Sequence, residues 1–216
     1  MEATLFADHL RPGMDVLDLG VGAGRTTPHL QGLGGRYVGI DLEPAMVDAA
    51  RARFPDADLR VGDAADLSAF DDGSFDAVVF SFNGLDYVTE RRRCLAECHR
   101  VLRPGGLLLA SRHNPRAVLA VPRRPTAPLW VLRRAARLVP TRAFWRGEGT
   151  VVEPPSGFNG PLLRRRPSAG TPLPTATATP KRVHRELRDH EFAVVATVGG
   201  SGATTSSYHY VARAEG

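Results

Sequence analysis

Three glycines at alternate positions follow an apolar run and precede a helical pattern. The run from Val16 to Leu19 reads VLDL, and Gly20, Gly22 and Gly24 come directly after it. Glycines spaced in this way let a backbone approach a ligand closely and adopt a positive φ at no steric cost. The loop could therefore hold a small molecule, or it could be a plain turn that joins a strand to a helix.

Two phosphate-binding interpretations of this loop fail on its spacing. A dinucleotide site requires the pattern G-x-G-x-x-G, but Arg25 stands where the third glycine would be. A P-loop requires Gly-Lys-Ser/Thr after its first glycine, and no such triplet follows. The spacing argues against NAD and against nucleoside triphosphates.

Strand and helix patterns alternate around the loop. Apolar runs bounded by turn residues predict buried strands at 15–20, 36–41, 57–63, 74–82 and 107–113. Amphipathic patterns predict helices at 25–33, 44–54 and 89–102, the last one stopped by RPGG at 103–106. Such alternation with short connections implies a parallel sheet with right-handed crossovers.

The pattern changes after His113. Residues 114–180 are rich in Pro and Arg and contain one amphipathic helix candidate at 128–140. A helix capped by Thr179 is expected at 179–190, with Pro180 in its first turn. Strands expected at 192–199 and 206–214 follow each other directly and therefore predict an antiparallel hairpin.

Length and composition favour one domain. A chain of 216 residues can bury one full core but is short for two domains and a linker. Apolar runs stay below the roughly eighteen residues that a membrane span needs, and MEATLFADHL lacks the basic start of a signal peptide. We expect a cytoplasmic protein without a membrane span. Cys94 and Cys98 are expected to be reduced and buried on one helix face.

Charge is unevenly distributed along the chain. Residues 1–111 hold 11 arginines against 17 acidic residues, whereas residues 112–188 hold 16 basic residues against 3 acidic ones. The basic segment could attract an anionic partner such as a nucleotide, a carrier protein, RNA or lipid headgroups. It could equally reflect a GC-rich gene, because Lys181 is the only lysine among 28 basic residues.

Four motifs in order resemble the class I S-adenosylmethionine-dependent methyltransferases. They are LDLGVGAG at 17–24, the segment at 37–67 with acids after the second and third strands, FDAVVFSFNGLDYV at 75–88, and ECHRVLRPGGLLLASRHN at 97–114. The resemblance covers about residues 10–114. It implies one Rossmann-like domain over residues 1–216, with a seven-stranded, mostly parallel sheet, a C-terminal antiparallel hairpin and helices on both faces.

The resemblance also implies a cofactor site for S-adenosylmethionine, with S-adenosylhomocysteine as product. The glycine loop would curve beneath the methionine and ribose, and Asp18 would accept backbone N–H groups or contact the ligand's ammonium. Asp41 would accept both ribose hydroxyls, although it could merely initiate the next helix. The implied set is Asp18, Gly20, Gly22, Gly24, Arg25, Asp41, Leu42, Met46, Asp63, Ala64, Ser81 and Phe82. Within it, Leu42 and Met46 would pack on adenine, and Asp63, which could merely start a turn, would accept from its amine.

Candidates for the chemistry follow the fourth and fifth strands. Methyl transfer is an in-line displacement that gains from alignment and exclusion of water, and a base is needed only when the acceptor loses a proton. His113 is the first choice because histidine ionises near neutral pH, and it could equally orient the neighbouring loop. Asp86 and Tyr87 are further candidates, and His184 could enter from the later helix. We expect no metal, because Asp86 lacks the paired acids of a magnesium site.

Departures from familiar subclasses favour a small-molecule acceptor, for which a secondary metabolite and an anionic or carrier-tethered intermediate are the candidates. The loop SFNG at 81–84 lacks the Asp/Asn-Pro-Pro-aromatic pattern of amino-methylating nucleic-acid enzymes. Only 15 residues precede the first motif strand, so we expect this sequence to lack most of the N-terminal helices that often cover the cofactor in this family. The insertion at 114–180 is then the candidate lid and substrate-recognition segment. An RNA methyltransferase and a non-catalytic, methyltransferase-like partner subunit remain alternatives. The oligomeric state stays open.

Overall fold

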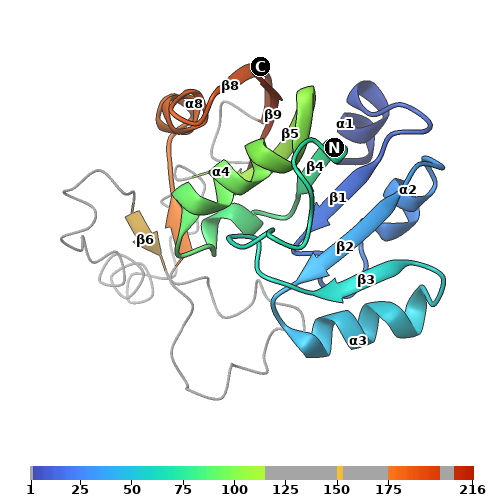
Figure 1. The fold of residues 1–216 in the computed structure, drawn as a ribbon. Helices are drawn as coiled ribbons and strands as arrows, with labels where there is room; N and C mark the ends of the chain where they lie inside the picture. The colour runs from blue at the N-terminus through green and yellow to red at the C-terminus, as the bar shows by residue number, and fades with distance from the viewer. Residues whose placement is uncertain (1, 115–149, 153–174, 200–206) are drawn as a thin grey trace, which may run out of the picture.

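The computed structural model describes residues 2–114, 150–152, 175–199 and 207–216. A seven-stranded sheet with strand order β3-β2-β1-β4-β5-β9-β8 forms its centre. The strands are β1 (Val16–Leu19), β2 (Tyr37–Asp41), β3 (Asp58–Val61), β4 (Phe75–Phe80), β5 (Leu102–His113), β8 (Phe192–Val198) and β9 (Ser207–Ala214). The first five are parallel, and β9 runs antiparallel to both β5 and β8. The predicted mostly parallel sheet with a terminal hairpin is confirmed (Figure 1).

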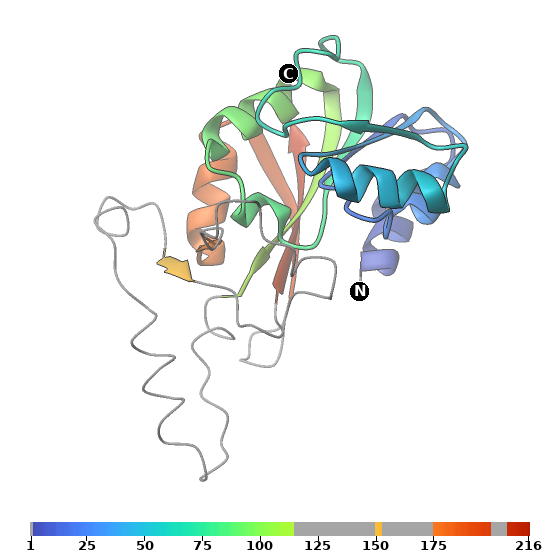
Figure 2. The ribbon, with the colours of Figure 1, turned by 90° about the horizontal axis from the view of Figure 1, so that it is seen from below.

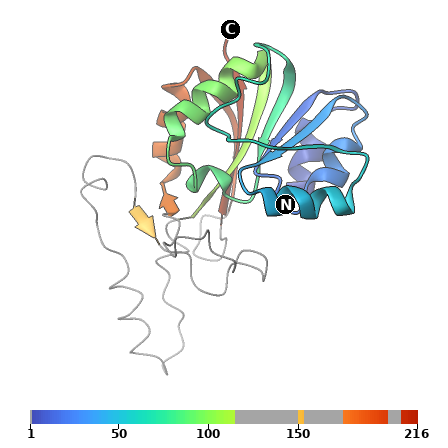
Figure 3. The same cartoon turned by 60° about the horizontal axis from the view of Figure 1, so that its bottom comes forward.

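Helices cover both faces of the sheet, as predicted (Figures 2 and 3). They are α1 (Glu2–His9), α2 (Thr27–Gln31), α3 (Pro44–Arg53), α4 (Arg91–Val101) and α8 (Pro180–Arg188), with a short 3-10 turn η1 (Gly84–Asp86) after β4. Two apolar cores result. Buried side chains of α1, α2 and α3 pack on one face, and those of α4 and α8 pack on the other. Apolar burial on both faces explains the continuous apolar runs of the central strands.

The start of β5 differs from the sequence prediction. RPGG was expected to end a helix as a turn, but residues 103–106 already belong to β5. The pairing register shifts there between Phe75 and Ala77 of β4, which align with Leu102 and Leu107 of β5. Gly105, at φ 79°, supplies the left-handed backbone that such an irregularity needs.

An ionic cluster joins three strands at the amino end of the sheet. The Arg103 guanidinium lies 2.8 Å from Asp15 Oδ2 and 2.6 Å from Asp76 Oδ1. The backbone N–H of Asp15 also donates to Asp76 Oδ2 at 2.8 Å. We call these three residues the amino-end clamp. It ties the entrances of β1, β4 and β5 together at the rim opposite the glycine loop.

The C-terminal elements follow the prediction with one correction. α8 begins at Pro180 after Thr179, whose backbone is extended as a cap should be, but the Thr179 side chain makes no capping hydrogen bond. Instead, the Thr179 carbonyl accepts from the N–H groups of Arg182 and Val183. Within the predicted insertion, β6 (Thr150–Val152) and β7 (Thr175–Thr177) form an antiparallel pair. The helix predicted at 128–140 lies outside the described residues.

The two cysteines behave as predicted: Cys94 and Cys98 are free and buried on one face of α4. In the described part of the chain, no helix is long and apolar enough to cross a membrane.

Candidate active site

The glycine loop lies between β1 and α2 at the carboxyl edge of the sheet. Gly20, Gly22 and Gly24 all have positive φ, at 64°, 55° and 82°. A methyl group added at Gly24 would lie 2.6 Å from the Phe54 ring, whereas one added at Gly22 would meet nothing within 4 Å. Gly24 is therefore needed for packing, whereas Gly22 has open space beside it.

Asp18 of β1 makes hydrogen bonds that hold the far end of this loop. Its Oδ2 accepts hydrogen bonds from Thr26 Oγ1 at 2.5 Å and from the Tyr37 hydroxyl at 3.1 Å. The predicted bonds from backbone N–H groups are thus replaced by bonds from side-chain hydroxyls. Burial raises the pKa of Asp18 to about 7, against the opposing effect of these two hydrogen bonds. Asp18 Oδ1 is buried without a hydrogen-bond partner among the described residues.

Asp41 fastens the loop from the side. At the end of β2, its Oδ2 accepts the Gly22 N–H at 2.8 Å, and its Oδ1 accepts the Glu43 N–H at 2.9 Å. The second bond orders the entrance to α3, as the alternative interpretation of Asp41 anticipated. Because each carboxylate oxygen can accept more than one hydrogen bond, Asp41 retains capacity for a ligand's hydroxyl groups.

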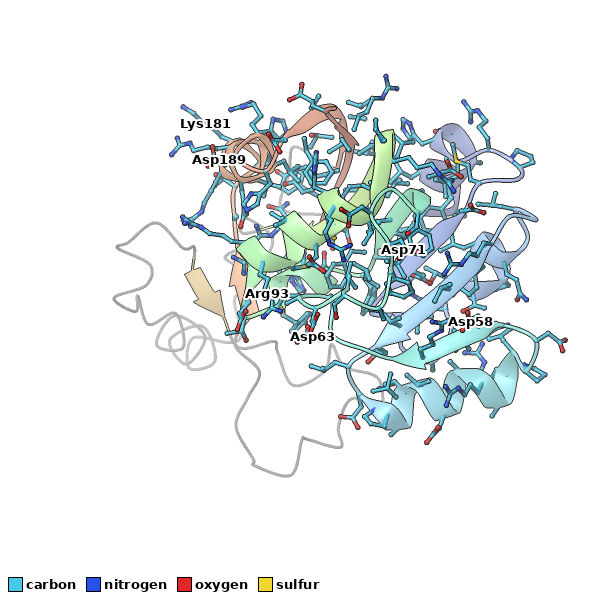
Figure 4. All side chains as sticks on the ribbon, in the orientation of Figure 1. Asp58, Asp63, Asp71, Arg93, Lys181 and Asp189 are labelled. Atoms are coloured by element: carbon cyan, nitrogen blue, oxygen red, sulfur yellow. The ribbon has the colours of Figure 1, made fainter. Side chains whose placement is uncertain are left out.

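The residues proposed for the adenine lie along the next stretch of this edge. Leu42 leaves 69% of its surface exposed, a high value for a large apolar side chain, and Met46 is half-buried on α3. Asp63 follows β3 (Figure 4) and uses Oδ1 to accept the Ala65 N–H at 2.8 Å, so it does start a turn. Ala64 packs partly against the core.

The loop after β4 carries unusual backbone geometry. Phe82 and Asn83 adopt positive φ angles of 53° and 63°, which cost non-glycine residues about 1–2 kcal/mol each. A side chain at Gly84 would collide with the Phe80 ring at 2.1 Å. The bend exposes 53% of Phe82, and the Arg25 guanidinium lies 5.1 Å from its ring centroid. Strain of this kind concentrates at functional sites.

A glutamate from α1 also reaches this loop. The Glu2 carboxylate pairs with Arg25 and accepts hydrogen bonds from the Ser81 hydroxyl and, at 3.3 Å, from the Phe82 N–H. The Arg25 Nη2 donates to Ser81 Oγ at 2.9 Å. Arg25, Ser81 and Phe82 therefore lie together, and a carboxylate lies among them.

The three catalytic candidates also meet at this edge. His113, at the end of β5, has Nδ1 2.9 Å from Asp86 Oδ2, and the same oxygen accepts the His113 backbone N–H at 2.7 Å. The Tyr87 ring meets the imidazole edge-on, with centroids 6.0 Å apart. Asp86 is fully buried, whereas 12% of the His113 side chain is exposed. The structure thus assembles a histidine and a carboxylate that orients it.

The structure does not bring His184 to this site. Its Nε2 lies 2.8 Å from Thr197 Oγ1 of β8. Within the described residues, no group of three or more His, Cys, Asp and Glu side chains could hold a metal ion.

Several residues of the site were missed from the sequence. Thr26 and Tyr37 hold Asp18, Glu2 reaches Ser81, and Arg112 pairs with Asp86. Tyr37 and Arg112 each lie inside a predicted strand, so only the alternation of strand faces indicated the direction of their side chains. The contact of Glu2 depends on α1, for which the sequence offered no motif.

Comparison with known proteins shows which proteins this chain is similar to. Residues 17–110 match the family model described as a methyltransferase domain. Demethylmenaquinone methyltransferase of Beutenbergia cavernae is 44% identical over 112 residues, 52% of this chain and 46% of that protein. Ubiquinone biosynthesis O-methyltransferase of Xanthomonas campestris is 36% identical over 107 residues, 48% of this chain and 44% of that protein. The chain spans less than half the length of these curated relatives.

Solved structures share the fold over nearly the whole chain. An S-adenosylmethionine-dependent methyltransferase from Methanosarcina mazei has a TM-score of 0.69 at 20% identity and covers 98% of this chain and 97% of its own. The 1,6-didemethyltoxoflavin-N1-methyltransferase of Burkholderia thailandensis, solved with S-adenosylhomocysteine, has a TM-score of 0.65 at 19% identity, over 99% and 76%. The family match spans the glycine loop and the strands that carry the site, so residues 17–110 are similar to a methyltransferase domain, and the described chain has the fold of S-adenosylmethionine-dependent methyltransferases.

Proposed function

We propose that this chain binds S-adenosylmethionine and methylates a small-molecule acceptor whose reacting atom gives up a proton. The observation that carries the proposal is the His113–Asp86 pair, 2.9 Å apart, at the same edge of the sheet as the glycine loop. A histidine oriented by a buried carboxylate is an arrangement suited to general-base catalysis. Acceptors with an O–H, an acidic N–H or an activated carbon need such a base.

The residues present fit the cofactor. The open space at Gly22 lets the ligand approach the backbone of the loop closely. The Asp41 carboxylate, which is bonded to the Gly22 N–H, can accept the ribose hydroxyls. Exposed Leu42 offers an apolar surface to adenine. The orphaned Oδ1 of Asp18 offers a buried acceptor near the methionine end. The exposed Leu42 side chain and the unpaired Asp18 oxygen otherwise cost stability, and a bound ligand would offset that cost.

The chemistry divides between cofactor and chain. When bound, S-adenosylmethionine supplies a methyl group on a sulfonium, and in-line displacement leaves S-adenosylhomocysteine. The Asp86 carboxylate accepts a hydrogen bond from Nδ1–H of His113 and so fixes the tautomer in which Nε2 is the basic nitrogen. Nε2 then takes the proton from the acceptor atom while that atom forms its bond to the methyl carbon. Positioning of these groups supplies much of the acceleration.

The acceptor class follows from the same site. The curated relatives include methyltransferases named for demethylmenaquinone and for ubiquinone biosynthesis, whose names point to small ring compounds. Asn114 follows His113 directly and is fully buried, so the insertion at 114–180 begins beside the base. We assign acceptor recognition to this insertion, whose arginines suit an anionic or carrier-tethered molecule.

Calorimetric titration tests the cofactor first. We expect micromolar binding of S-adenosylmethionine and S-adenosylhomocysteine and none of NAD.

An acceptor screen with demethylmenaquinol, small phenols and acidic N–H heterocycles follows, with bulk RNA as a competing candidate. His113→Ala should lower turnover about a hundredfold and leave cofactor affinity unchanged. His29→Ala is the matched control, because His29 is exposed on α2. Unchanged turnover in His113→Ala would remove the base from the mechanism.

A further inference from the structure

A buried arginine lies directly behind the His113–Asp86 pair. Arg112 precedes His113 in β5, and its side chain is 1% exposed. Its Nε donates to Asp86 Oδ1 at 2.6 Å, and its Nη1 donates to Glu186 Oε2 at 2.8 Å. Glu186 comes from α8, which follows the insertion. The guanidinium thus bridges two carboxylates from two different elements.

Burial of these charges needs an explanation. A buried ion costs several kcal/mol unless it is paired and hydrogen-bonded, and an apolar group of similar volume is often as stable. Stability alone therefore gives no reason to place an arginine at this position. What the arginine supplies is direction, because a guanidinium is a rigid, planar fork with fixed donor positions.

Arg112 orients the carboxylate of Asp86, as the hydrogen bonds of both carboxylate oxygens show. Its Oδ1 accepts from Arg112, and its Oδ2 accepts from both the backbone N–H and Nδ1 of His113. The carboxylate is held on both oxygens and cannot rotate without breaking one of these bonds. The orientation of the imidazole depends on that carboxylate.

Further charged residues surround this group. Arg91 of α4 lies 3.7 Å from Glu186, so Arg91 and Arg112 both pair with that carboxylate. Arg182 of α8 also acts on Arg91 electrostatically. Two tyrosines also lie near this group. Tyr87 contacts the imidazole, and buried Tyr210 of β9 interacts electrostatically with Arg112 and Asp86.

We propose that Arg112 and Glu186 are positioning residues that hold Asp86 as a fixed carboxylate and thereby set the tautomer and orientation of His113. The meaning of this arrangement for catalysis rests on the proposed function, but the arrangement itself does not. Arg112 acts on Asp86 directly, and Glu186 acts through Arg112. Because Glu186 belongs to α8, docking of this helix is part of the construction of the base.

Nitrogen-15 NMR of the imidazole tests the proposal without any acceptor. In the wild-type protein, the His113 signals should show the tautomer with the proton on Nδ1. In Arg112→Gln, Asp86 loses the charged donor that fixes its Oδ1, so its carboxylate can turn. A carboxylate that turns no longer holds the Nδ1–H of His113 in one direction, so the His113 signals should shift away from that tautomer. Turnover should fall at least about tenfold, with cofactor affinity within about twofold of wild type.

Further variants keep the test decisive if Arg112→Gln folds poorly. Glu186→Ala removes the acceptor of Arg112 Nη1 and should give a smaller shift of the same kind. Glu186→Gln keeps a carbonyl acceptor and should restore the wild-type spectrum. Arg100→Gln is the matched control, because Arg100 also bridges two carboxylates, those of Glu97 and Asp72, on the far part of α4. It should change stability but neither the His113 spectrum nor turnover.

The outcomes separate this proposal from the proposed function. Wild-type tautomer and turnover in a folded Arg112→Gln or Glu186→Ala protein would overturn the positioning role of the residue concerned. The expected spectral shifts in a protein that methylates no acceptor would uphold the positioning role and overturn the proposed function instead.

Discussion

Glu2 of α1 accepts a hydrogen bond from the hydroxyl of Ser81 at the exit of β4, although 79 residues separate them along the chain. Burial by itself would raise the pKa of Glu2, but the bonds from Ser81 and the Arg25 guanidinium outweigh it and hold that pKa below its ordinary value. The side chain is thus charged at neutral pH. In the proposed site, this carboxylate lies where the methionine end of the cofactor belongs, among Arg25, Ser81 and Phe82.

Removal of Glu2 should strengthen cofactor binding. Glu2→Ala frees Arg25 and the Ser81 hydroxyl for the carboxylate of the ligand and removes a like charge. We expect the Kd for S-adenosylhomocysteine to fall about two- to fivefold by calorimetry, in line with a partly exposed ion pair. Asp8→Ala, an exposed change on the same helix, should leave the Kd unaltered. Weaker binding in Glu2→Ala would instead make Glu2 a ligand for the ammonium group.

Loss of the Asp41 charge should weaken cofactor binding. In Asp41→Ala, the ribose hydroxyls lose their acceptor and the Gly22 N–H loses its partner. We expect binding to weaken by about 1–3 kcal/mol, with little change in the circular dichroism spectrum. Asp48→Ala on the exposed face of α3 serves as the control. Equal affinity in both variants would leave Asp41 only its structural bonds to Gly22 and Glu43.

Two glycines of one loop should respond differently to the same change. Gly24→Ala places a methyl group 2.6 Å from the Phe54 ring at a φ of 82° and should lower the free energy of unfolding by about 2–4 kcal/mol. Gly22→Ala meets no atom within 4 Å, so it should cost only about 1–2 kcal/mol of backbone strain. Its methyl group would project toward the ligand and weaken cofactor binding at least about tenfold. Chemical denaturation and calorimetry measure the two effects, and identical behaviour of the variants would contradict the assignment.

The buried Asp18 should make stability depend on pH. Its pKa is raised to about 7 by burial, against about 3.9 in an unfolded chain. Between these values the folded protein holds one more proton than the unfolded chain, so the free energy of unfolding decreases as pH rises. From pH 5 to pH 8 this contribution amounts to about 2–3 kcal/mol. Urea unfolding at both pH values should show it in the wild type and not in Asp18→Asn, which keeps acceptors for Thr26 and Tyr37. The same pH dependence in both proteins would refute the assignment.

Much of the fold was predictable because its signals are local. The apolar run before Gly20 and the helical pattern that contains Cys94 and Cys98 each depend on neighbours in sequence, and both elements were confirmed. The prediction of a turn at RPGG, residues 103–106, was wrong because it also depended on local residue types alone. Its turn-forming residues are accommodated in β5 by a register shift against β4, which only the partner strand reveals.

The candidate site was predictable in its members and less so in its connections. His113, Asp86 and Tyr87 were expected near one another because each follows a parallel strand, and the structure brings them into contact. The bonds of Glu2 to Ser81 and of Glu186 to Arg112 join residues 79 and 74 positions apart. No spacing rule reaches across such distances, since these contacts depend on how helices dock on a completed sheet.

The amino-end clamp has a consequence for motion in this molecule. Arg103 binds Asp15 and Asp76 across the entrances of three adjacent strands, so those entrances are held at a constant separation. The exits of the same strands carry the glycine loop, the Phe82 turn and His113, which these ion pairs do not join. We therefore expect the carboxyl ends of these strands to move more than their amino ends, so that the site can adjust to a ligand while the opposite rim of the sheet keeps its shape.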